Sequence, residues 1–429
     1  MKHSAAKKQR LPALLLAAIL LMGALTGCRS ASAGGSTSSP ASAETAVRGF
    51  DPSSTDWDAI VKAARGTTVT FYGWGGDADR NEYLNTTVAQ ALKAQYDITL
   101  EVVGMDIDQI LSQLSGEKQA GTESGSIDMI WINGENFRSA RENGLLYGPF
   151  TQSLPSYQQW VDMKDTENQQ DFGYPIEGYE APYGKAQMVL IKDSARTPET
   201  PKNAQELLEF VKQYPGQVTY PAPPDFTGSA FVRNIVYELC GDTQFQNMAA
   251  DKETLRAAVA PAMEYLRQLN PYLWNQGKTF PATSGEVETM FLDGELALNM
   301  SYSPFTVSTG IEKGTYPATA ETFVLDNGTI GNTNYIAIAY NSPNKAGAMA
   351  AINYILSEDG QLSQYRALRT IPVLSPKLLE QSQLDAFHAV DIGQGVLTQE
   401  ELLEHRLPEM PSALVPLLEE IWLEEVVGK

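Results

Sequence analysis

Histidine and cysteine are scarce in this sequence of 429 residues. It holds three histidines (His3, His388 and His405) and two cysteines (Cys28 and Cys240). A structural zinc site takes four clustered ligands, mostly Cys and His, so the sequence argues against one, and we expect no metal. Two cysteines also cannot build the disulfide network that stabilises small secreted domains. We therefore expect stability to come from the size of the apolar core.

Basic residues are also few relative to acidic ones. The sequence has 31 Lys and Arg against 52 Asp and Glu, a formal net charge of -21. Such a surface repels nucleic acid, so no nucleic-acid partner is expected. It is compatible with a cationic ligand, but an acidic composition is also common among soluble secreted proteins. The net charge alone therefore leaves the ligand open.

Motifs of nucleophilic catalysis and ATP binding are absent. The sequence contains no Gly-x-Ser-x-Gly motif. The segment nearest to a phosphate-binding loop, residues 116–122, has Thr122 where that loop needs a lysine. We therefore expect no cofactor, and any ATP chemistry belongs to a partner chain.

One apolar run stands near the N-terminus. Four basic residues precede a run from Leu11 to Leu25, which ends in Thr26-Gly27-Cys28. The run is shorter than the roughly 20 residues of a membrane-spanning helix, and the pattern is typical of a signal peptide over residues 1–27. Removing these residues, which include four basic and no acidic ones, changes the net charge from -21 to -25.

The tetrapeptide at residues 25–28 resembles the lipobox of bacterial lipoproteins. The resemblance implies cleavage before Cys28, lipid on its sulfur, and an extracytoplasmic protein anchored to the bacterial membrane. A plain secretory signal with an incidental cysteine is the alternative. Residues 28–50 are rich in Ser, Ala, Gly and Thr and predict a flexible tether.

The rest of the chain, more than 370 residues, suggests two domains. Its first part alternates strand and helix patterns, which predicts a mainly parallel sheet covered on both faces. In such sheets, ligands bind beyond the carboxyl ends of strands. The expected strands are residues 68–74, 98–103 and 127–132, and the helices between and after them begin near residues 79, 107 and 133.

The second part mixes clearer and weaker patterns. Asn203 followed by Glu206 predicts a capped helix start. Residues 188–192 predict a strand that crosses between the domains. Further expectations are a strand at residues 217–220, a helix at 229–239, a polar turn at 328–334 followed by a strand at 335–340, and a C-terminal helix from residue 414.

The order of these pieces resembles the extracellular solute-binding proteins of ABC importers, of the bilobed class that includes maltodextrin, polyamine, thiamine and ferric-ion binders. The segment Trp131-Ile132-Asn133-Gly134-Glu135-Asn136-Phe137 also looks like a little-characterised branch associated with thiamine-type importers. The telling segments are residues 69–77, 127–150, 183–193, 201–203, 290–298 and 338–360.

This resemblance implies an α/β, two-lobe, periplasmic-binding-protein-like fold of type II with a ligand cleft between the lobes. Lobe one is expected at residues 51–186 plus 331–375, and lobe two at 187–330 plus 376–429. The lobes close over a small solute by hinge motion. The implied partners are an ABC permease and its ATPase, and the protein is expected to be a monomer and not an enzyme.

The expected ligand-binding residues combine glycines that admit the ligand to the backbone, amides that hydrogen-bond and aromatic rings that stack. Tyr183 with Tyr302 could also imitate the tyrosine pair of ferric binders, although two packing tyrosines are the simpler interpretation. The expected set is Trp74, Gly75, Gly76, Asp77, Trp131, Asn133, Glu135, Asn136 and Tyr183 in lobe one, Asp225, Phe226, Thr227 and Tyr302 in lobe two, and Lys185, Gln187, Asn332 and Asn334 near the hinge.

Two arguments compete over the charge of the ligand. Helix N-termini after Gly75-Gly76 and at Ser229 favour an anion. Asp77, Glu135 and Asp225, together with aromatic residues in the same loops, favour a cation. We expect a cationic or zwitterionic solute, thiamine-like first and a polyamine second, ahead of a sugar or oxyanion.

Two other functions remain open at this stage. A glycan-acting enzyme would use Glu135 and Asp225 as paired carboxylates, roughly 5 to 10 Å apart. A structural surface lipoprotein would lack a deep polar cleft.

Overall fold

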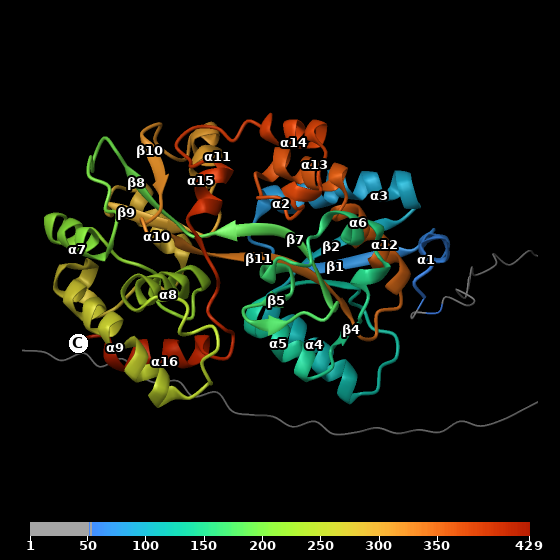
Figure 1. Ribbon diagram of the computed structural model, residues 1–429, viewed down its shortest axis with the longest axis horizontal. Helices are drawn as coiled ribbons and strands as arrows, with labels where there is room; N and C mark the ends of the chain where they lie inside the picture. Colours follow the sequence, from blue (N-terminus) through green and yellow to red (C-terminus); the bar gives the residue numbers. More distant parts are fainter. Residues whose placement is uncertain (1–50, 52–53) are drawn as a thin grey trace, which may run out of the picture. The chain divides into compact units, whose positions relative to one another are not determined.

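The computed structural model describes Asp51 and residues 54–429 (Figure 1). The expected signal peptide, the lipid site at Cys28 and the whole of the expected tether lie outside these residues. Within the described part of the chain, no helix is long and apolar enough to cross a membrane.

A seven-stranded sheet organises the first lobe. Its main path runs β12-β11-β3-β1-β2, and β4 and β7 also pair with β11. β1 is parallel to β2 and β3, whereas β11 is antiparallel to β3. The strands are β1 (Thr68–Gly73), β2 (Thr99–Gly104), β3 (Met129–Ile132), β4 (Leu146–Tyr147), β7 (Glu180–Gln187), β11 (Thr329–Ala339) and β12 (Arg406–Leu407).

Both faces of this sheet are covered, as the sequence predicted. Ile336 and Ile338 of β11 belong to one buried cluster, which includes much of α12, and Tyr335 and Ala337 belong to another on the opposite face. Burying one large apolar side chain contributes about 1.5–3 kcal/mol. In Figure 1 the helices grouped with this sheet are α1 (Trp57–Ala64), α2 (Ala78–Tyr83), α3 (Ala89–Tyr96), α4 (Ile107–Gln119), α5 (Gly134–Glu142), α6 (Pro155–Trp160), α12 (Lys345–Ile355), α13 (Glu358–Leu368) and α14 (Gln381–His388).

A second sheet, with the antiparallel order β10-β8-β9, organises the second lobe. Its strands are β8 (Val189–Asp193), β9 (Leu298–Ser301) and β10 (Ala320–Phe323). Leu190 and Met300 share a buried cluster with Trp422 of the last helix. The helices in the remaining part are α7 (Ala204–Gln213), α8 (Phe226–Cys240), α9 (Lys252–Leu269), α10 (Ser284–Leu292), α11 (Thr306–Lys313), α15 (Gln399–Glu404) and α16 (Val415–Glu425).

Two long strands link the lobes. β7 and β11 pair with each other over most of their length, and Figure 1 shows both running from one group of elements toward the other. β7 leads directly into β8 across Met188. Residues 188–192 were expected to form the crossing strand, but most of them belong to β8 and pair within the second sheet. The strand that crosses is the preceding one, β7. The lobe boundaries given above stay a prediction.

Three local expectations were wrong. Residues 328–334 are not a polar turn, because Thr329 to Asn334 form the first half of β11. Residues 217–220 form no strand: the Gln217 and Val218 carbonyls accept isolated backbone hydrogen bonds from Ala297 and Trp274 rather than a strand ladder. α8 begins at Phe226 rather than Ser229, since the Asp225 side chain caps the helix by accepting from the Gly228 N–H.

Candidate ligand site

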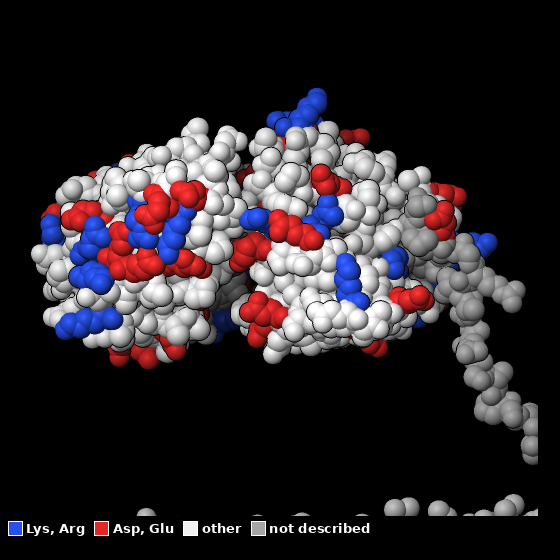
Figure 2. Space-filling view, turned by 90° about the horizontal axis from the view of Figure 1, so that it is seen from below, with Lys and Arg blue, Asp and Glu red and all other residues white. Residues whose placement is uncertain are grey.

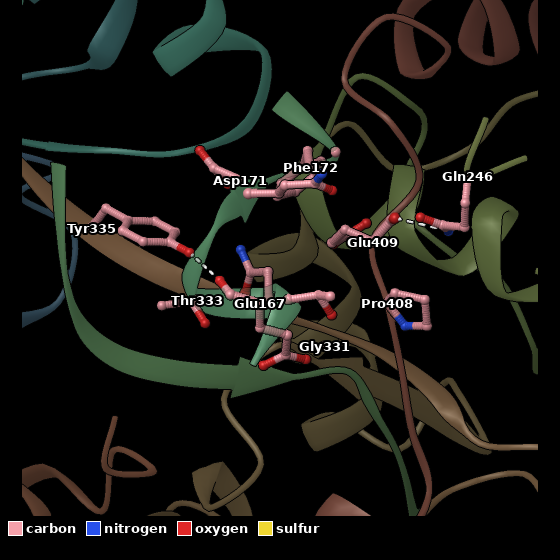
Figure 3. A pocket seen from close by; sticks show the side chains of 13 residues that line it. Glu167, Asp171, Phe172, Gln246, Gly331, Thr333, Tyr335, Pro408 and Glu409 are labelled. Atoms are coloured by element: carbon pink, nitrogen blue, oxygen red, sulfur yellow. Dashed lines mark hydrogen bonds between the residues drawn. The ribbon is translucent and has the colours of Figure 1, made fainter. Parts of the chain in front are cut away.

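A cavity of about 90 Å³ lies where the strand β11, a short hairpin and the C-terminal segment meet (Figure 3). The hairpin consists of β5 (Gln170–Asp171) and β6 (Tyr174–Pro175). Acidic and amide side chains dominate the wall. The lining residues are Thr166, Glu167, Gln170, Asp171, Phe172, Gly173, Gln246, Gly331, Asn332, Thr333, Tyr335, Pro408 and Glu409.

The tip of the hairpin bridges the two lobes. Phe172 and Gly173 both have positive φ, as a two-residue hairpin turn requires. The Phe172 ring is buried in the second lobe's core, 6.3 Å from the ring of Phe226, and its carbonyl accepts from the Ser412 N–H at 2.7 Å. On the other side, the Asp171 carboxylate accepts from the Gly134 N–H at the start of α5. The hairpin tip therefore contacts elements of both lobes.

Glu409 forms a buried ion pair with Arg233, in which both of its carboxylate oxygens accept hydrogen bonds. Its two carboxylate oxygens accept from Arg233 Nε at 3.1 Å and Nη2 at 3.3 Å, and the Tyr302 hydroxyl also donates to it. Burial raises the pKa of the Glu409 carboxyl, and Arg233 and Tyr302 oppose that rise. The charge of Glu409 is thus compensated within the protein.

Glu167 is held by two cations. Arg406 Nε lies 2.7 Å from one carboxylate oxygen and Lys185 Nζ lies 3.2 Å from the other. Burial favours the neutral acid, but the two cations together lower the pKa of Glu167 below its ordinary value. Because Arg406 is in β12 and Lys185 in β7, this carboxylate ties the C-terminal segment to a linking strand.

Asp171 and Glu180 form no direct ion pair with a basic side chain of the described residues, although the more distant charge of Arg141 opposes the rise in the pKa of Glu180. Burial, together with the nearby charges of Glu135 and Glu409, raises the pKa of Asp171 well above its ordinary value despite the Gly134 N–H. Glu180 is fully buried on β7, and neither carboxylate oxygen has a hydrogen-bond partner among the described residues. Burial first and Asp171 second raise the pKa of Glu180. Both carboxyl groups therefore hold their protons more tightly than they would in water.

The residues expected at the tip of the first lobe's sheet do not line the cavity. Trp74 is 54% exposed, and Asn81 donates a hydrogen bond to the Gly75 carbonyl. A side chain at Gly76 would collide with the Trp74 ring, which explains the glycine there. Asp77 caps α2 by accepting from the Arg80 N–H at 3.0 Å.

A second group of expected residues is assembled around an arginine. The Arg80 guanidinium stacks on Trp131, 3.7 Å from the ring centroid, and the Tyr183 ring meets Trp131 edge-on at 6.1 Å. Asn334 accepts from Trp131 Nε1 at 3.3 Å and from Asn133 at 3.5 Å. Glu135 and Asn136 follow in the first turn of α5 and are partly exposed.

The expected residues of the second lobe and the hinge are closer to the cavity. Phe226 packs on both Phe172 and Tyr302, and the adjacent Thr227 is buried. Asn332 lines the cavity itself. Gln187 is fully buried in β7, where its amide donates to Thr329 and to the His405 carbonyl.

The hairpin and C-terminal contributions were missed by the sequence reasoning. Asp171 and Phe172 belong to a short hairpin, and Glu409 lies far from them in the sequence, in an irregular C-terminal segment. Phe172-Gly173, which has polar residues on both sides, was a weak indication of a hairpin turn. No sequence pattern indicated that Glu409 or Glu167 would lie at the cavity. Among the described residues, no group of three or more Cys, His, Asp or Glu side chains is arranged to hold a metal ion.

The face shown in Figure 2 carries interleaved acids and bases. On α9 and α16, Lys252 pairs with Glu420 and Glu424, and Arg256 pairs with Glu424 and Glu425. Exposed pairs of this kind contribute about 0–1 kcal/mol each. The surface acids are thus partly neutralised by neighbours, in contrast to Asp171 at the cavity.

Comparisons with known proteins agree with this architecture. The family model described as bacterial extracellular solute-binding protein matches residues 87–381. The chain is 36% identical over 372 residues to protein YnjB of Escherichia coli (strain K12), which covers 86% of this chain and 93% of YnjB.

Solved structures share the fold at low sequence identity. An ABC transporter structure from Clostridium perfringens ATCC 13124 matches with a TM-score of 0.59 and 19% identity, covering 83% of this chain and 99% of that one. The spermidine/putrescine ABC transporter substrate-binding protein PotD from Streptococcus pneumoniae matches with a TM-score of 0.59 and 14% identity, covering 84% and 98%. The fold is thus the two-lobe, periplasmic-binding-protein-like α/β fold. The chain belongs to the family of bacterial extracellular solute-binding proteins, and is the extracytoplasmic substrate-binding component of an ABC transporter.

Proposed function

We propose that this protein captures a small organic cation or zwitterion and delivers it to an ABC permease. The acid-lined cavity carries the proposal. Three carboxylates border it, and the protein's own cations engage two of them, Glu167 and Glu409. Asp171 is left with a single backbone N–H as its hydrogen-bond donor.

The electrostatic cost of this arrangement favours a cation as ligand. An ionised carboxylate buried without a counter-ion is expensive, and the group then becomes neutral instead. A ligand cation next to Asp171 supplies the missing charge and makes ionisation favourable. An anionic ligand in the same cavity would face Glu167, Asp171 and Glu409 at once.

The cavity admits only part of a solute. Ligand sites usually measure about 300–1,000 Å³, whereas this one measures about 90 Å³. We infer that the lobes separate about β7 and β11 to admit the rest of the ligand. The outer residues Trp74, Gly75, Gly76, Asp77, Glu135 and Asn136 then form the remaining contacts, with the lobes divided at the boundaries given above.

The ligand remains one of several organic cations. A thiamine-like solute and a polyamine both fit the proposal, and the Streptococcus pneumoniae protein of the same fold is described as a spermidine/putrescine binder. At 14% identity that likeness concerns the fold alone.

Membrane anchoring through Cys28 belongs to the same proposal. Cys28→Ser should leave an uncleaved or soluble precursor, because no neighbouring residue can accept the lipid. Acylated, membrane-bound protein in that variant would refute the anchor. The monomeric state is checked by sedimentation of the mature chain.

The two alternatives have less support. A glycan-acting enzyme would need Asp225 as a free carboxylate, but both of its oxygens accept backbone hydrogen bonds, from Gly228 and Ser284, each at 2.9 Å. The family consists of solute-binding proteins. A purely structural lipoprotein would have no use for a polar cavity between its lobes.

Native mass spectrometry of the purified mature protein, followed by calorimetry against cations, anions and sugars, tests the proposal. We expect a cation to bind tightly and Asp171→Asn to weaken it by about tenfold or more. Glu135→Gln and Asp225→Asn measure the contribution of the outer acids. Tight binding of an anionic or uncharged solute that is insensitive to all three changes would overturn the ligand assignment and leave the family assignment standing.

A further inference from the structure

We propose that the hairpin of β5 and β6 is a latch that holds the two lobes together through the ring of Phe172. This inference rests on the proposed function, because it concerns the closing motion that retains the ligand. Hinge closure follows from the family, whereas a built-in contact that favours the closed state does not. Such a contact raises the apparent affinity for a solute, because the binding conformation is more populated before the solute arrives.

The base of the hairpin is part of the first lobe. Ile176, directly after β6, is 2% exposed and belongs to a buried cluster on one face of the seven-stranded sheet. The Tyr174 ring meets Phe137 of α5 edge-on at 6.0 Å, and Asp171 accepts from the Gly134 N–H at the start of the same helix. The base therefore moves with the first lobe.

The tip of the hairpin is buried in the second lobe. Phe172 is 4% exposed and belongs to the buried cluster that contains Met410 and Leu414. Its ring lies 6.3 Å from the ring of Phe226, and its carbonyl accepts from the Ser412 N–H at 2.7 Å. Separation of the lobes with the base in place would break these contacts.

The ring lies between the first residues of two helices. A Cβ atom at Gly134, which begins α5, would lie 3.4–3.5 Å from three carbons of the Phe172 ring. Phe226, on which the ring also packs, begins α8. The expected ligand residues Glu135 and Thr227 come next in these two helices. The latch therefore lies beside the expected ligand contacts of both lobes.

The backbone of the turn indicates that the ring itself matters. Phe172 has a φ of 45° and Gly173 a φ of 71°, and two-residue turns of this kind favour Asn-Gly or Gly-Gly. A residue larger than glycine is strained at such a φ. Burial of the ring offsets this strain only while the lobes are in contact, so the tip is most stable in the closed arrangement.

Apolar burial distinguishes the latch from the ion pairs that also join the lobes. Asp79 pairs with Lys313, and Glu312 with Arg369, but each pair has at least one side chain that is about half exposed. Such pairs contribute little and are weakened by salt, whereas salt does not screen the burial of a phenyl ring. High salt should therefore leave the lobes closed.

Spin labels on the two lobes test the latch in the ligand-free mature protein. Ser139→Cys on α5 and Glu253→Cys on α9 are exposed positions for the labels, in a Cys240→Ser background. Double electron–electron resonance measures the distance between them. We expect one short distance with the natural hairpin, in low and in high salt. Phe172→Ala should raise the ratio of long to short distances about tenfold or more, equivalent to about 1.4 kcal/mol or more.

Two further variants locate the effect. Tyr174→Ala is the matched control, because it removes from the same hairpin a ring that packs within the first lobe. This variant should leave the distance short. Phe226→Ala should lengthen the distance as Phe172→Ala does, and the two changes together should add little more, since they remove the same contact.

Phe172→Asn decides the case if Phe172→Ala fails to fold, as judged by circular dichroism and thermal unfolding. It gives the hairpin the Asn-Gly turn that such hairpins favour and removes only the ring. An unchanged short distance without the ring, or equal opening in Tyr174→Ala, would overturn the latch. Because these measurements use no ligand, the latch can fail while a cation binds, and the proposed ligand charge can fail while the latch stands.

Discussion

Asp171 and Glu409 border the same cavity but are compensated differently. Glu409 accepts from the guanidinium of Arg233 and from the Tyr302 hydroxyl, all of them buried or partly buried. Asp171 accepts from one backbone N–H and has no basic partner among the residues that the structure describes. Glu409 is therefore suited to holding the second lobe against the C-terminal segment, and Asp171 to meeting a charge from outside.

The two carboxylates should also differ in what their loss affects, folding stability for Glu409 and ligand binding for Asp171. Breaking a compensated buried pair leaves an isolated charge and destabilises the fold. Removing a buried carboxyl that lacks a counter-ion can stabilise the folded state, while it weakens the binding of a cationic ligand. The variants below sharpen or break this distinction, from the largest expected effect to the smallest.

Arg233→Met should have the largest effect on stability. Arg233 is 1% exposed, and its loss leaves Glu409 without its cation. We expect the free energy of unfolding to fall by about 3–5 kcal/mol, measured by urea denaturation. The control is Arg256→Met, which removes a partly exposed arginine paired with Glu424 and Glu425 at the surface. Equal effects in the two variants would contradict the distinction between buried and surface pairs.

Glu180→Gln should change how stability depends on pH. The raised pKa of Glu180 means that the folded state holds the proton more tightly than the unfolded chain does. Its contribution to stability is full below the ordinary carboxyl pKa and is lost as pH rises through the raised folded value. The ligand-free protein should therefore gain stability on mild acidification, and the variant should gain less. An unchanged pH profile of the unfolding midpoint would show that Glu180 is already ionised in the fold.

Asp225→Ala should destabilise the protein by about 0.5–2 kcal/mol, the usual range for loss of a helix N-cap. Its carboxylate accepts from the Gly228 N–H within α8 and from the Ser284 N–H at the start of α10. Asp225→Asn keeps an acceptor oxygen and should lose less. Thermal unfolding of both variants measures the difference, and equal losses would argue that charge rather than capping matters at this position.

Asp79→Asn should have the smallest effect. Asp79 pairs with Lys313 across the lobes, but both side chains are about half exposed. Surface pairs of this kind contribute about 0–1 kcal/mol, and salt weakens them further. A loss well above 1 kcal/mol in denaturant titration would assign this pair a role in holding the lobes together.

The regular elements could be predicted because their patterns are local. The predicted alternation of strands and helices over residues 68–142 matches the structure. The hydrophobic periodicity and the helix caps that predict these elements depend only on residues close together in the sequence. Asn203 caps α7 as expected, by accepting from the Glu206 N–H. The first half of β11 was missed because Thr329, Asn332, Thr333 and Asn334 interrupt the apolar alternation that marks a strand in the sequence.

The candidate site was only partly predictable. Asn332 was placed near the hinge from its sequence context, and it does lie on a linking strand. Asp171 and Glu409 reach the cavity through a hairpin and a C-terminal segment whose positions depend on tertiary contacts, such as the Ser412 to Phe172 hydrogen bond. Sequence patterns do not report which irregular segments meet in space.

Proton release on ligand binding tests the central claim most directly. Calorimetry of a primary amine in buffers of different ionisation enthalpy counts the protons exchanged, at about pH 5.5, above the ordinary Asp range. Because burial raises the pKa of Asp171 and a cation bound beside it would lower that pKa, we predict that binding releases protons and that Asp171→Asn releases fewer. Proton uptake on binding, or equal release by the wild-type protein and Asp171→Asn, would contradict the account.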